Sequence, residues 1–178
     1  MSDRYVALLR GINVGGKNLI RMADLRGAFE DMGFEGVATY IQSGNVLFGS
    51  VGAPEAHSIE AALTERFGIA LKVVLRSAAD LRRVVAEAPE GFGAATHRCD
   101  LIFVRPPLTA ERALAVAELR DGIDQAWAGP GVVYFARLAA RASGSRLSRI
   151  VATPEYQDMT IRNWRTTTKL DELLSATA

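Results

Sequence analysis

The chain has 178 residues, enough to bury one hydrophobic core or two small, closely packed ones. Hydrophobic residues make up 49% and charged residues 23% of it, close to the averages of soluble globular proteins, so neither disorder nor a membrane role is predicted. No apolar run approaches the ~20 residues of a spanning helix, and the N-terminus lacks the long apolar segment of a signal peptide. We therefore expect a cytoplasmic protein without a membrane partner.

The net charge of +1 is unevenly distributed along the chain. Residues 23–70 hold seven acidic and two basic side chains, whereas residues 136–169 hold seven basic and two acidic ones. A nearly neutral total can therefore hide a basic patch that attracts an anion. The alternative, which the sequence leaves open, is an ordinary solvated helix face.

The residues that most often carry covalent or metal chemistry are few. Cys99 is the single cysteine and lies in an apolar run, so a disulfide within the chain is excluded and a buried structural thiol is favoured over a nucleophile. The chain has only two histidines, His57 and His97, besides this one cysteine, and so small a set of ligands argues against a metal site. Neither has a sequence neighbour that suggests a catalytic triad with Ser43, so a serine hydrolase is disfavoured. The sequence identifies no catalytic residue and no cofactor.

The first half of the chain is predicted to contain four strands and two helices. Apolar runs predict strands, and apolar residues at helical spacing, each series ended by a glycine, predict helices. The strands are expected at residues 5–12, 37–41, 46–48 and 71–75, and the helices at residues 22–32 and 59–67. Their order is βαββαβ. A right-handed crossover makes the first two strands parallel, so their carboxyl ends should emerge on the same side of the sheet.

The second half repeats this order of elements, although not the residues themselves. A helix that opens with the capping-box pattern Ser77-Ala-Ala-Asp80 joins the halves. The loop at residues 89–96, rich in Gly and Ala, predicts domains at residues 1–92 and 93–178. Further strands are expected at residues 97–104, 125–127, 132–135 and 159–161, helices at residues 109–119 and 145–151, and a final helix capped by Thr166 or Thr167. The predicted fold class is α+β, with two ferredoxin-like halves packed together, mainly antiparallel sheets and helices on one face.

A glycine-rich segment, Arg-Gly-Ile-Asn-Val-Gly-Gly-Lys-Asn at residues 10–18, follows the first predicted strand. It matches part of a P-loop, but an asparagine replaces the hydroxyl that would hold Mg²⁺ and no helix starts directly after the motif, so a P-loop NTPase is disfavoured. Gly15 and Gly16 can still offer backbone N–H groups to an anion, with Arg10 and Lys17 supplying charge. The alternative is that the two glycines only reverse the chain.

A second polar segment, Gln-Ser-Gly-Asn at residues 42–45, separates the two strands of a predicted hairpin. Because the first two strands should end on the same side of the sheet, we expect this segment to lie beside the glycine-rich one. Its amides and hydroxyl can bind a ligand. They can equally make ordinary turn contacts with their own backbone.

A third polar cluster precedes the final predicted helix. Arg162, Asn163 and Arg165 lie next to a helix N-terminus, an arrangement that favours anions. The alternative is structural: Trp164 would anchor the helix in the core while Arg162 pairs with an acidic side chain.

Several of these segments together resemble the bacterial domain of unknown function 1697 family, over the whole chain. The resemblance rests on Tyr5-Val-Ala-Leu-Leu-Arg-Gly-Ile-Asn-Val-Gly-Gly-Lys-Asn18, Met22, Thr39-Tyr-Ile-Gln-Ser-Gly-Asn45, Ser145-Arg-Leu-Ser148, Thr160-Ile-Arg-Asn-Trp-Arg-Thr166 and Lys169-Leu170. It implies an α+β protein in two parts and implies no activity. The polar residues that fall on the family's motifs are the predicted ligand-binding residues: Arg10, Asn13, Gly15, Gly16, Lys17, Asn18, Gln42, Ser43, Asn45, Arg162, Asn163 and Lys169.

The function these residues favour is the binding of an anionic small molecule, such as a nucleotide or a phosphorylated metabolite. If the protein is an enzyme, electrostatic stabilisation is favoured over covalent or metal catalysis. One alternative is a module that binds single-stranded nucleic acid, although few aromatic residues on the predicted strands are suited to stacking on bases. The other is a scaffold in which the polar motifs form an internal network. The sequence leaves the ligand, the oligomeric state and the presence of catalysis open.

Overall fold

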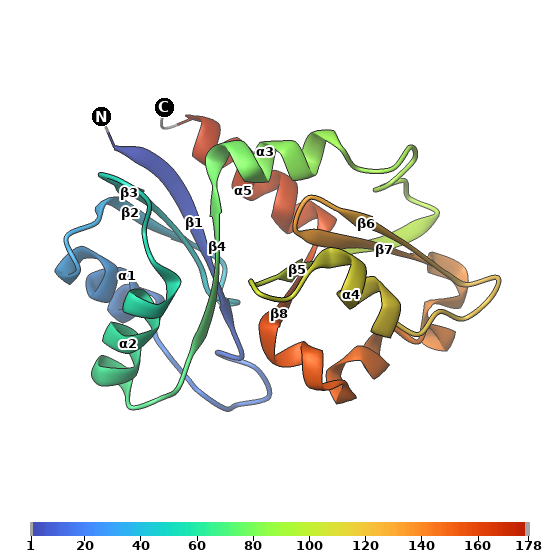
Figure 1. The fold of residues 1–178 in the computed structure, drawn as a ribbon, viewed down its shortest axis with the longest axis horizontal. Helices are drawn as coiled ribbons and strands as arrows, with labels where there is room; N and C mark the ends of the chain where they lie inside the picture. The colour runs from blue at the N-terminus through green and yellow to red at the C-terminus, as the bar shows by residue number, and fades with distance from the viewer. Residues whose placement is uncertain (1, 177–178) are drawn as a thin grey trace. The chain divides into compact units, whose positions relative to one another are not determined.

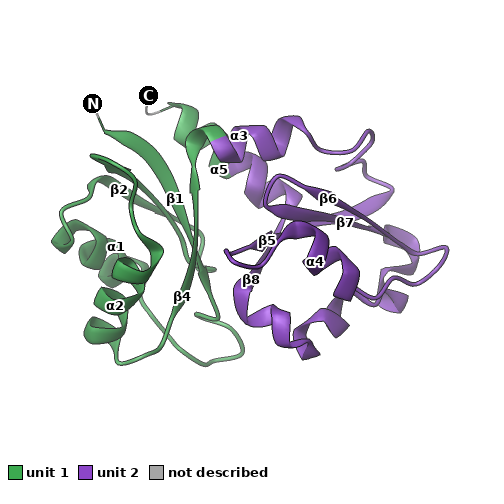
Figure 2. Cartoon of the chain, viewed as in Figure 1, with its two compact units in different colours: residues 1–79, 170–178 green, residues 80–169 purple. Residues whose placement is uncertain are grey.

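The computed structural model describes residues 2–176 and has a mixed α+β fold with two four-stranded antiparallel sheets (Figure 1). The chain divides into two compact units, one containing residues 1–79 and 170–178 and the other residues 80–169 (Figure 2). The predicted boundary after residue 92 therefore falls inside the second unit. The connecting helix groups with that unit because Leu81 and Val84 on it are buried and the backbone carbonyl of Val84 accepts a hydrogen bond from the Tyr134 hydroxyl at 2.6 Å.

The first unit contains one sheet and two helices. Its elements are β1 (Asp3–Arg10), α1 (Met22–Asp31), β2 (Glu35–Tyr40), β3 (Asn45–Ser50), α2 (Ala56–Phe67) and β4 (Lys72–Ser77). The strands lie in the order β2-β3-β1-β4, and every neighbouring pair is antiparallel. Because β3 separates β1 from β2, these two strands run parallel to each other, as predicted.

Both helices of the first unit pack on one face of its sheet (Figure 1). The core between them includes Leu9, Phe29, Phe48 and Leu63, each at most 1% exposed. Burying each such side chain contributes roughly 1.5–3 kcal/mol of transfer free energy. Helix α2 ends at Gly68, whose φ of 66° lies in the left-handed region that a glycine C-cap adopts at low cost.

The second unit adds a sheet with the same relative strand order. Its elements are α3 (Ala78–Ala86), β5 (His97–Val104), α4 (Ala110–Val116), β6 (Asp124–Gly129), β7 (Val132–Leu138), the 3₁₀ helices η1 (Ala139–Gly144), η2 (Leu147–Ala152) and η3 (Pro154–Asp158), β8 (Met159–Asn163) and α5 (Trp164–Ala176). The strands lie in the order β6-β7-β5-β8, again antiparallel throughout. Helix α5 continues beyond this unit, since residues from Leu170 onward belong to the first.

The two faces of the second sheet have different coverings. On one face Ile102, Val133 and Phe135 pack against Ala113 of α4 and Ile150 of η2. On the other face, Tyr134 packs edge-on to Phe92 at a ring distance of 5.3 Å and reaches α3 through its hydroxyl group. Both faces of the central strands are therefore buried.

Two predictions about the second half were wrong in detail. The segment predicted to be helical at residues 145–151 forms a helix only from Leu147, and that helix is the short 3₁₀ helix η2. Its buried residues, Leu147 and Ile150, lie three positions apart, and a 3₁₀ helix places such residues on one side. The final helix begins at Trp164 instead of after a threonine cap. The Asn163 side chain accepts a hydrogen bond from the Thr166 backbone N–H at 2.7 Å, so Asn163 is the N-cap.

None of the helices within residues 2–176 has the length and apolar composition needed to cross a lipid bilayer.

Candidate functional site

The glycine-rich segment of the first unit is a tight β-hairpin. The Lys17 N–H donates to the Val14 carbonyl at 3.0 Å, and the Asn13 N–H donates to the Asn18 carbonyl at 3.1 Å. Gly15 and Gly16 form the tip with φ angles of 58° and 73°, the pair of positive values that a two-residue type I′ turn requires. The two glycines therefore reverse the chain, which is the structural role that the sequence left open.

The asparagines of this hairpin bind backbone groups. Asn13 Nδ2 donates to the carbonyls of Ile20 at 3.0 Å and Gln42 at 2.9 Å, while Asn13 Oδ1 accepts from the Ile20 N–H at 2.8 Å. Asn18 Nδ2 donates to the Gly11 carbonyl at 2.9 Å. Three bonds from one side chain brace the hairpin against its neighbours, so these amides act as an internal network.

The expected meeting of the two polar segments is confirmed. Besides the bond from Asn13 to Gln42, the Leu9 N–H donates to the Gly44 carbonyl at 2.8 Å. Gly44 has a φ of 82°, and a Cβ placed there would approach the Ile12 side chain to 2.8 Å, so only glycine fits. The turn at residues 42–45, which joins β2 to β3, therefore packs directly against the end of β1.

The remaining residues of the second segment make turn contacts. Asn45 is fully buried, and its Nδ2 donates to the Tyr40 carbonyl at 2.9 Å and to Ser43 Oγ at 3.0 Å. The Gln42 side chain and Lys17 are exposed, and Arg10 is half-buried. Of the predicted ligand-binding residues in the first unit, Lys17 and Gln42 thus present their long polar side chains most fully to solvent.

The predicted residues Arg162, Asn163 and Lys169 belong to the second unit. Arg162 is 7% exposed, and its Nη1 donates to Thr160 Oγ1 at 2.8 Å and to the Ile161 carbonyl at 2.9 Å. Burial lowers the pKa of Arg162 to about 10, so the guanidinium stays protonated at neutral pH. It is placed as a structural cation within its strand, whereas Lys169 is exposed.

A cavity of about 380 Å³ lies in the second unit, where β5 extends beyond the end of β8. The last residue pair of these two strands joins Asp100 to Asn163, so residues 97–99 of β5 have no β8 partner. The cavity is lined by Gly93, His97, Arg98, Cys99, Asp100, Arg137, Asn163, Trp164 and Arg165. The sequence pointed to Asn163 and Arg165 here, but it did not connect them with Arg98 or Arg137.

The charges on this cavity are mostly positive. Arg137 Nη2 lies 2.7 Å from Asp100 Oδ2, and both side chains are largely buried. Burial raises the pKa of Asp100, while the positive charges of Arg137 and Arg98 oppose that rise. Arg98 and Arg165 are exposed, and neither is in a salt bridge within residues 2–176. The single carboxylate of the lining is therefore engaged by one arginine, leaving two guanidinium groups for a ligand.

One wall of the cavity is closely packed and partly aromatic. A Cβ on Gly93 would come within 2.3 Å of Trp164 Nε1, so the indole lies flush against the Gly93 backbone. The Phe92 ring meets the Trp164 ring edge-on at 5.2 Å. The Gly93 N–H donates to Cys99 Sγ at 3.2 Å, and burial raises the pKa of this thiol. Cys99 is thus a buried, protonated thiol, as predicted, and not an activated nucleophile.

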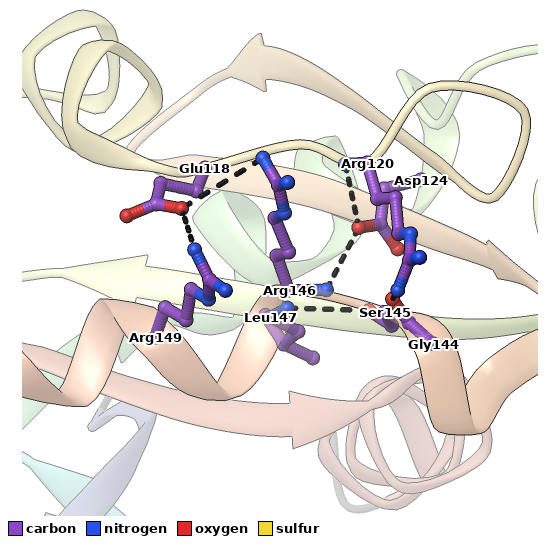
Figure 3. Close-up of polar contacts among 8 residues, drawn as sticks. All are labelled: Glu118, Arg120, Asp124, Gly144, Ser145, Arg146, Leu147 and Arg149. Carbon is purple, nitrogen blue, oxygen red and sulfur yellow. Dashed lines mark hydrogen bonds and ion pairs between the residues drawn. The ribbon is translucent and has the colours of Figure 1, made fainter.

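A second group of arginines in this unit is already paired (Figure 3). Glu118 accepts from Arg149 Nη1 at 2.6 Å and lies 3.9 Å from Arg146 Nη1. Asp124 Oδ2 accepts the backbone N–H groups of Arg120 and Arg146, both at 2.9 Å. These contacts of the Ser145–Ser148 segment therefore hold the start of η2 in place. It also neutralises part of the basic stretch at residues 136–169.

The few aromatic residues on the strands of the first unit are not arranged for stacking on bases. Phe48 is fully buried among the core rings, with Phe34 at a centroid distance of 4.4 Å and Phe29 at 5.3 Å. Tyr5 stacks on Phe48 at 5.9 Å. Neither ring is a free platform of the kind that RNA-binding sheets present.

Fold and site together define an α+β protein whose second unit carries an arginine-lined cavity. The chain belongs to the family described as "Protein of unknown function (DUF1697)", whose model matches residues 2–134. The match includes the glycine-rich and 42–45 segments and Arg98, while Arg137, Asn163 and Arg165 lie beyond it. A conserved bacterial protein of Streptococcus pneumoniae, SP0830, has a similar structure, with 28% sequence identity, a TM-score of 0.80, and coverage of 98% of this chain and 99% of that one. No curated protein matches the sequence.

Proposed function

We propose that the protein binds an anionic small molecule, in particular one that carries a phosphate group, in the cavity of the second unit. The observation that carries the proposal is the convergence of Arg98, Arg137 and Arg165 on one cavity whose single carboxylate, Asp100, is already paired. Unpaired guanidinium groups side by side repel each other, and an anion between them removes that cost.

Arginine suits a phosphate ligand better than other cations do. Its planar guanidinium donates two parallel hydrogen bonds to the oxygens of one phosphate or carboxylate group. Arg98 comes from β5 and Arg165 from the first turn of α5, so the two approach the cavity from different elements. Asp100 holds Arg137 by an ion pair of 2.7 Å and thereby orients a third guanidinium group.

The N-terminus of α5 adds a weaker attraction. The helix has 13 residues, and Asn163 and Trp164 at its start both line the cavity. Asn163 Oδ1 caps the Thr166 N–H, which leaves the amide Nδ2 as a donor. The positive end of the helix dipole favours an anion by typically 0.3–1 kcal/mol. This contribution is smaller than that of a charged hydrogen bond, so the arginines dominate.

The cavity also has the size and walls of a small-molecule site. Its volume of about 380 Å³ lies at the lower end of the roughly 300–1,000 Å³ typical of ligand pockets. Trp164 supplies an apolar surface among the lining residues, and the buried Cys99 also lines the cavity. A phosphorylated metabolite or a nucleotide combines the anionic and the flat parts that this lining matches.

The glycine-rich hairpin of the first unit has a smaller part in this proposal. Asn13, Asn18 and Asn45 use their amides on backbone carbonyls. Lys17 is the exposed cation of this hairpin, and its part in binding an anion stays a prediction.

The strand orders of the two units support our inference that each has a ferredoxin-like topology, with 3₁₀ helices in place of the second helix in the second unit. We place the protein in the cytoplasm.

Isothermal titration of the full-length protein with inorganic phosphate and a panel of nucleotides and sugar phosphates tests the proposal. We expect at least one phosphate compound to bind, and we expect Arg98→Gln and Arg165→Gln each to weaken it about 10-fold or more, since each loses a charge-assisted hydrogen bond. Arg149→Gln is the matched control, because Arg149 is also exposed but pairs with Glu118 and does not line the cavity. Binding that is unchanged in both cavity variants, or absent for every anion, overturns the proposal.

A further inference from the structure

The four edge strands of the two sheets differ in how they discourage pairing with another strand. The register between β2 and β3 is irregular between Glu35 and Ala38. The edge strand β4 carries Lys72 and Arg76, and β8 carries Arg162. Bulges and charges of this kind are the devices by which proteins protect sheet edges from a second strand.

The edge strand β6 has none of these devices over residues 125–129. Its sequence there, Gln-Ala-Trp-Ala-Gly, contains no charge and no proline. Its register with β7 is unbroken from the pair Asp124–Arg137 to the pair Gly129–Val132. Trp127 is 38% exposed, although its ring also contacts Phe92 edge-on at 6.5 Å. An exposed tryptophan on an unprotected edge is typical of a contact surface.

The register also shows which backbone groups of β6 point outward. The Leu138 N–H donates to the Ile123 carbonyl at 2.9 Å, in line with the register of β6 and β7. Hydrogen-bonded and non-hydrogen-bonded pairs alternate along an antiparallel ladder. Gln125, Trp127 and Gly129 therefore bond to β7. The N–H and C=O groups of Ala126 and Ala128 point to the open side of the sheet.

We propose that β6 pairs with β6 of a second copy of this chain, antiparallel and around a two-fold axis that passes between the two Trp127 residues. In that register Ala126 faces Ala128 of the partner subunit, and the two outward residues of each copy exchange four hydrogen bonds. The strand can pair with itself because, in the antiparallel register, the outward N–H and C=O groups of one copy face the C=O and N–H groups of the other. No like charges are brought together. The two sheets then form one continuous sheet of eight strands.

Trp127 favours this occupant over an unrelated peptide. The symmetric register makes it the central non-hydrogen-bonded pair, in which Cα atoms lie about 4.5 Å apart and side chains are closest. Two indoles then bury each other on the face that Phe92 already covers. Aromatic pairs at such cross-strand positions are among the more stabilising ones.

The ends of the strand limit the contact to a short ladder. The Asp124 N–H already donates to the Arg120 carbonyl at 2.9 Å, and Pro130, the next outward residue beyond Ala128, has no N–H group. Four hydrogen bonds and one aromatic pair make a small interface. We therefore expect a reversible dimer with a Kd between about 1 µM and 1 mM, not an obligate one.

Sedimentation velocity of the full-length protein from about 1 µM to about 1 mM tests this assignment. We expect a concentration-dependent monomer–dimer equilibrium. Trp127→Ala should raise the Kd about 10-fold, while Gln125→Ala, on the same face of the strand but outside the central pair, should leave it within about 2-fold. Ala128→Pro should abolish the dimer, since it removes an outward N–H without breaking a bond to β7.

Ala128→Lys is a second test that holds even if the proline variant fails to fold. Ala128 is exposed, so lysine adds a charge at the edge without disturbing the core, and Ala38→Lys places the same charge on the exposed surface of β2. Dimerisation should be lost with Ala128→Lys and kept with Ala38→Lys, with circular dichroism unchanged in both. A protein that stays monomeric throughout the range, or one whose dimer survives both Trp127→Ala and Ala128→Lys, overturns the assignment.

Discussion

Two polar regions of this protein look alike in sequence and differ in what their polar groups contact. The glycine-rich segment at residues 10–18 also contains two asparagines. The side-chain amides of Asn13 and Asn18 donate their hydrogen bonds to backbone carbonyls. In the cavity of the second unit, Arg98 and Arg165 have no such partners within residues 2–176. The comparison teaches that a dense polar motif is a candidate site only when its donors remain unsatisfied after folding.

Removing both available arginines should have the largest effect. The double variant Arg98→Gln/Arg165→Gln is expected to weaken binding of a phosphate ligand by about 100-fold or more, because two charge-assisted hydrogen bonds are lost. Titration calorimetry measures the change, and the free energy of unfolding should stay within about 0.5 kcal/mol, as for other exposed positions. A loss of binding from Lys17→Ala as large as that from the double variant would contradict the roles that we assign to the two regions.

In the glycine-rich hairpin, a substitution should lower the stability of the protein instead of its affinity for the ligand. Asn13→Ala is expected to lower the free energy of unfolding by about 2–3 kcal/mol, because it removes three hydrogen bonds and leaves the carbonyls of Ile20 and Gln42 without that donor. Urea denaturation measures this loss. Lys17→Ala is the matched control four residues away, with an expected change within about 0.5 kcal/mol. A stability unaffected by Asn13→Ala would show that the network does not brace the hairpin.

A smaller effect is expected at the tip of the hairpin. Gly16→Ala should cost about 1–2 kcal/mol, since alanine is strained at a φ of 73° although a Cβ meets nothing within 4 Å there. Gly27→Ala, in the interior of α1 at an ordinary φ, should instead be neutral or stabilising by up to about 1 kcal/mol. The difference between the two variants in thermal denaturation isolates backbone strain. Equal changes would mean that the turn conformation is not what the tip requires.

The smallest effect concerns the buried ion pair of the cavity. Burial raises the pKa of Asp100 in the folded protein, so the folded state holds this proton more tightly than the unfolded chain does. The contribution of Asp100 to stability is then fully present at low pH and falls as the pH rises through its folded-state pKa, above the ordinary value of 3.8. The stability of the natural protein relative to Asp100→Asn should decline over that range in urea titrations. A relative stability that increases with pH would mean that Arg137 outweighs burial.

Much of the fold followed from local patterns in the sequence. Strand β1, which ends at Arg10, and helix α2, which stops at Gly68, were predicted because an apolar run and a glycine C-cap are local signals. The 3₁₀ segments were not, since Leu147 and Ile150 are spaced equally well for an α-helix. Asn163 was predicted as a ligand residue, while its capping of α5 depends on where β8 ends.

The site was harder to predict than the fold because it depends on strand register. Arg98 and Arg137 are 39 positions apart and face each other only because β5 and β7 pair in one particular register. A pattern of single residues in two apolar strands carries no signal of that pairing. The clustered polar motifs were easier to notice, but in the first unit their amides hold the backbone together.

One spectrum can test directly whether the cavity of the second unit or the hairpin of the first binds the anion. The chain has two tryptophans, of which Trp164 lines the cavity and Trp127 does not. In a ¹H–¹⁵N correlation spectrum titrated with inorganic phosphate, or with the tightest phosphate compound from the panel, we expect the Trp164 indole signal to shift and saturate. The Trp127 indole and the Gly15 and Gly16 amides should stay in place. Saturable shifts at Gly15 and Gly16 with an unmoved Trp164 indole would contradict the account.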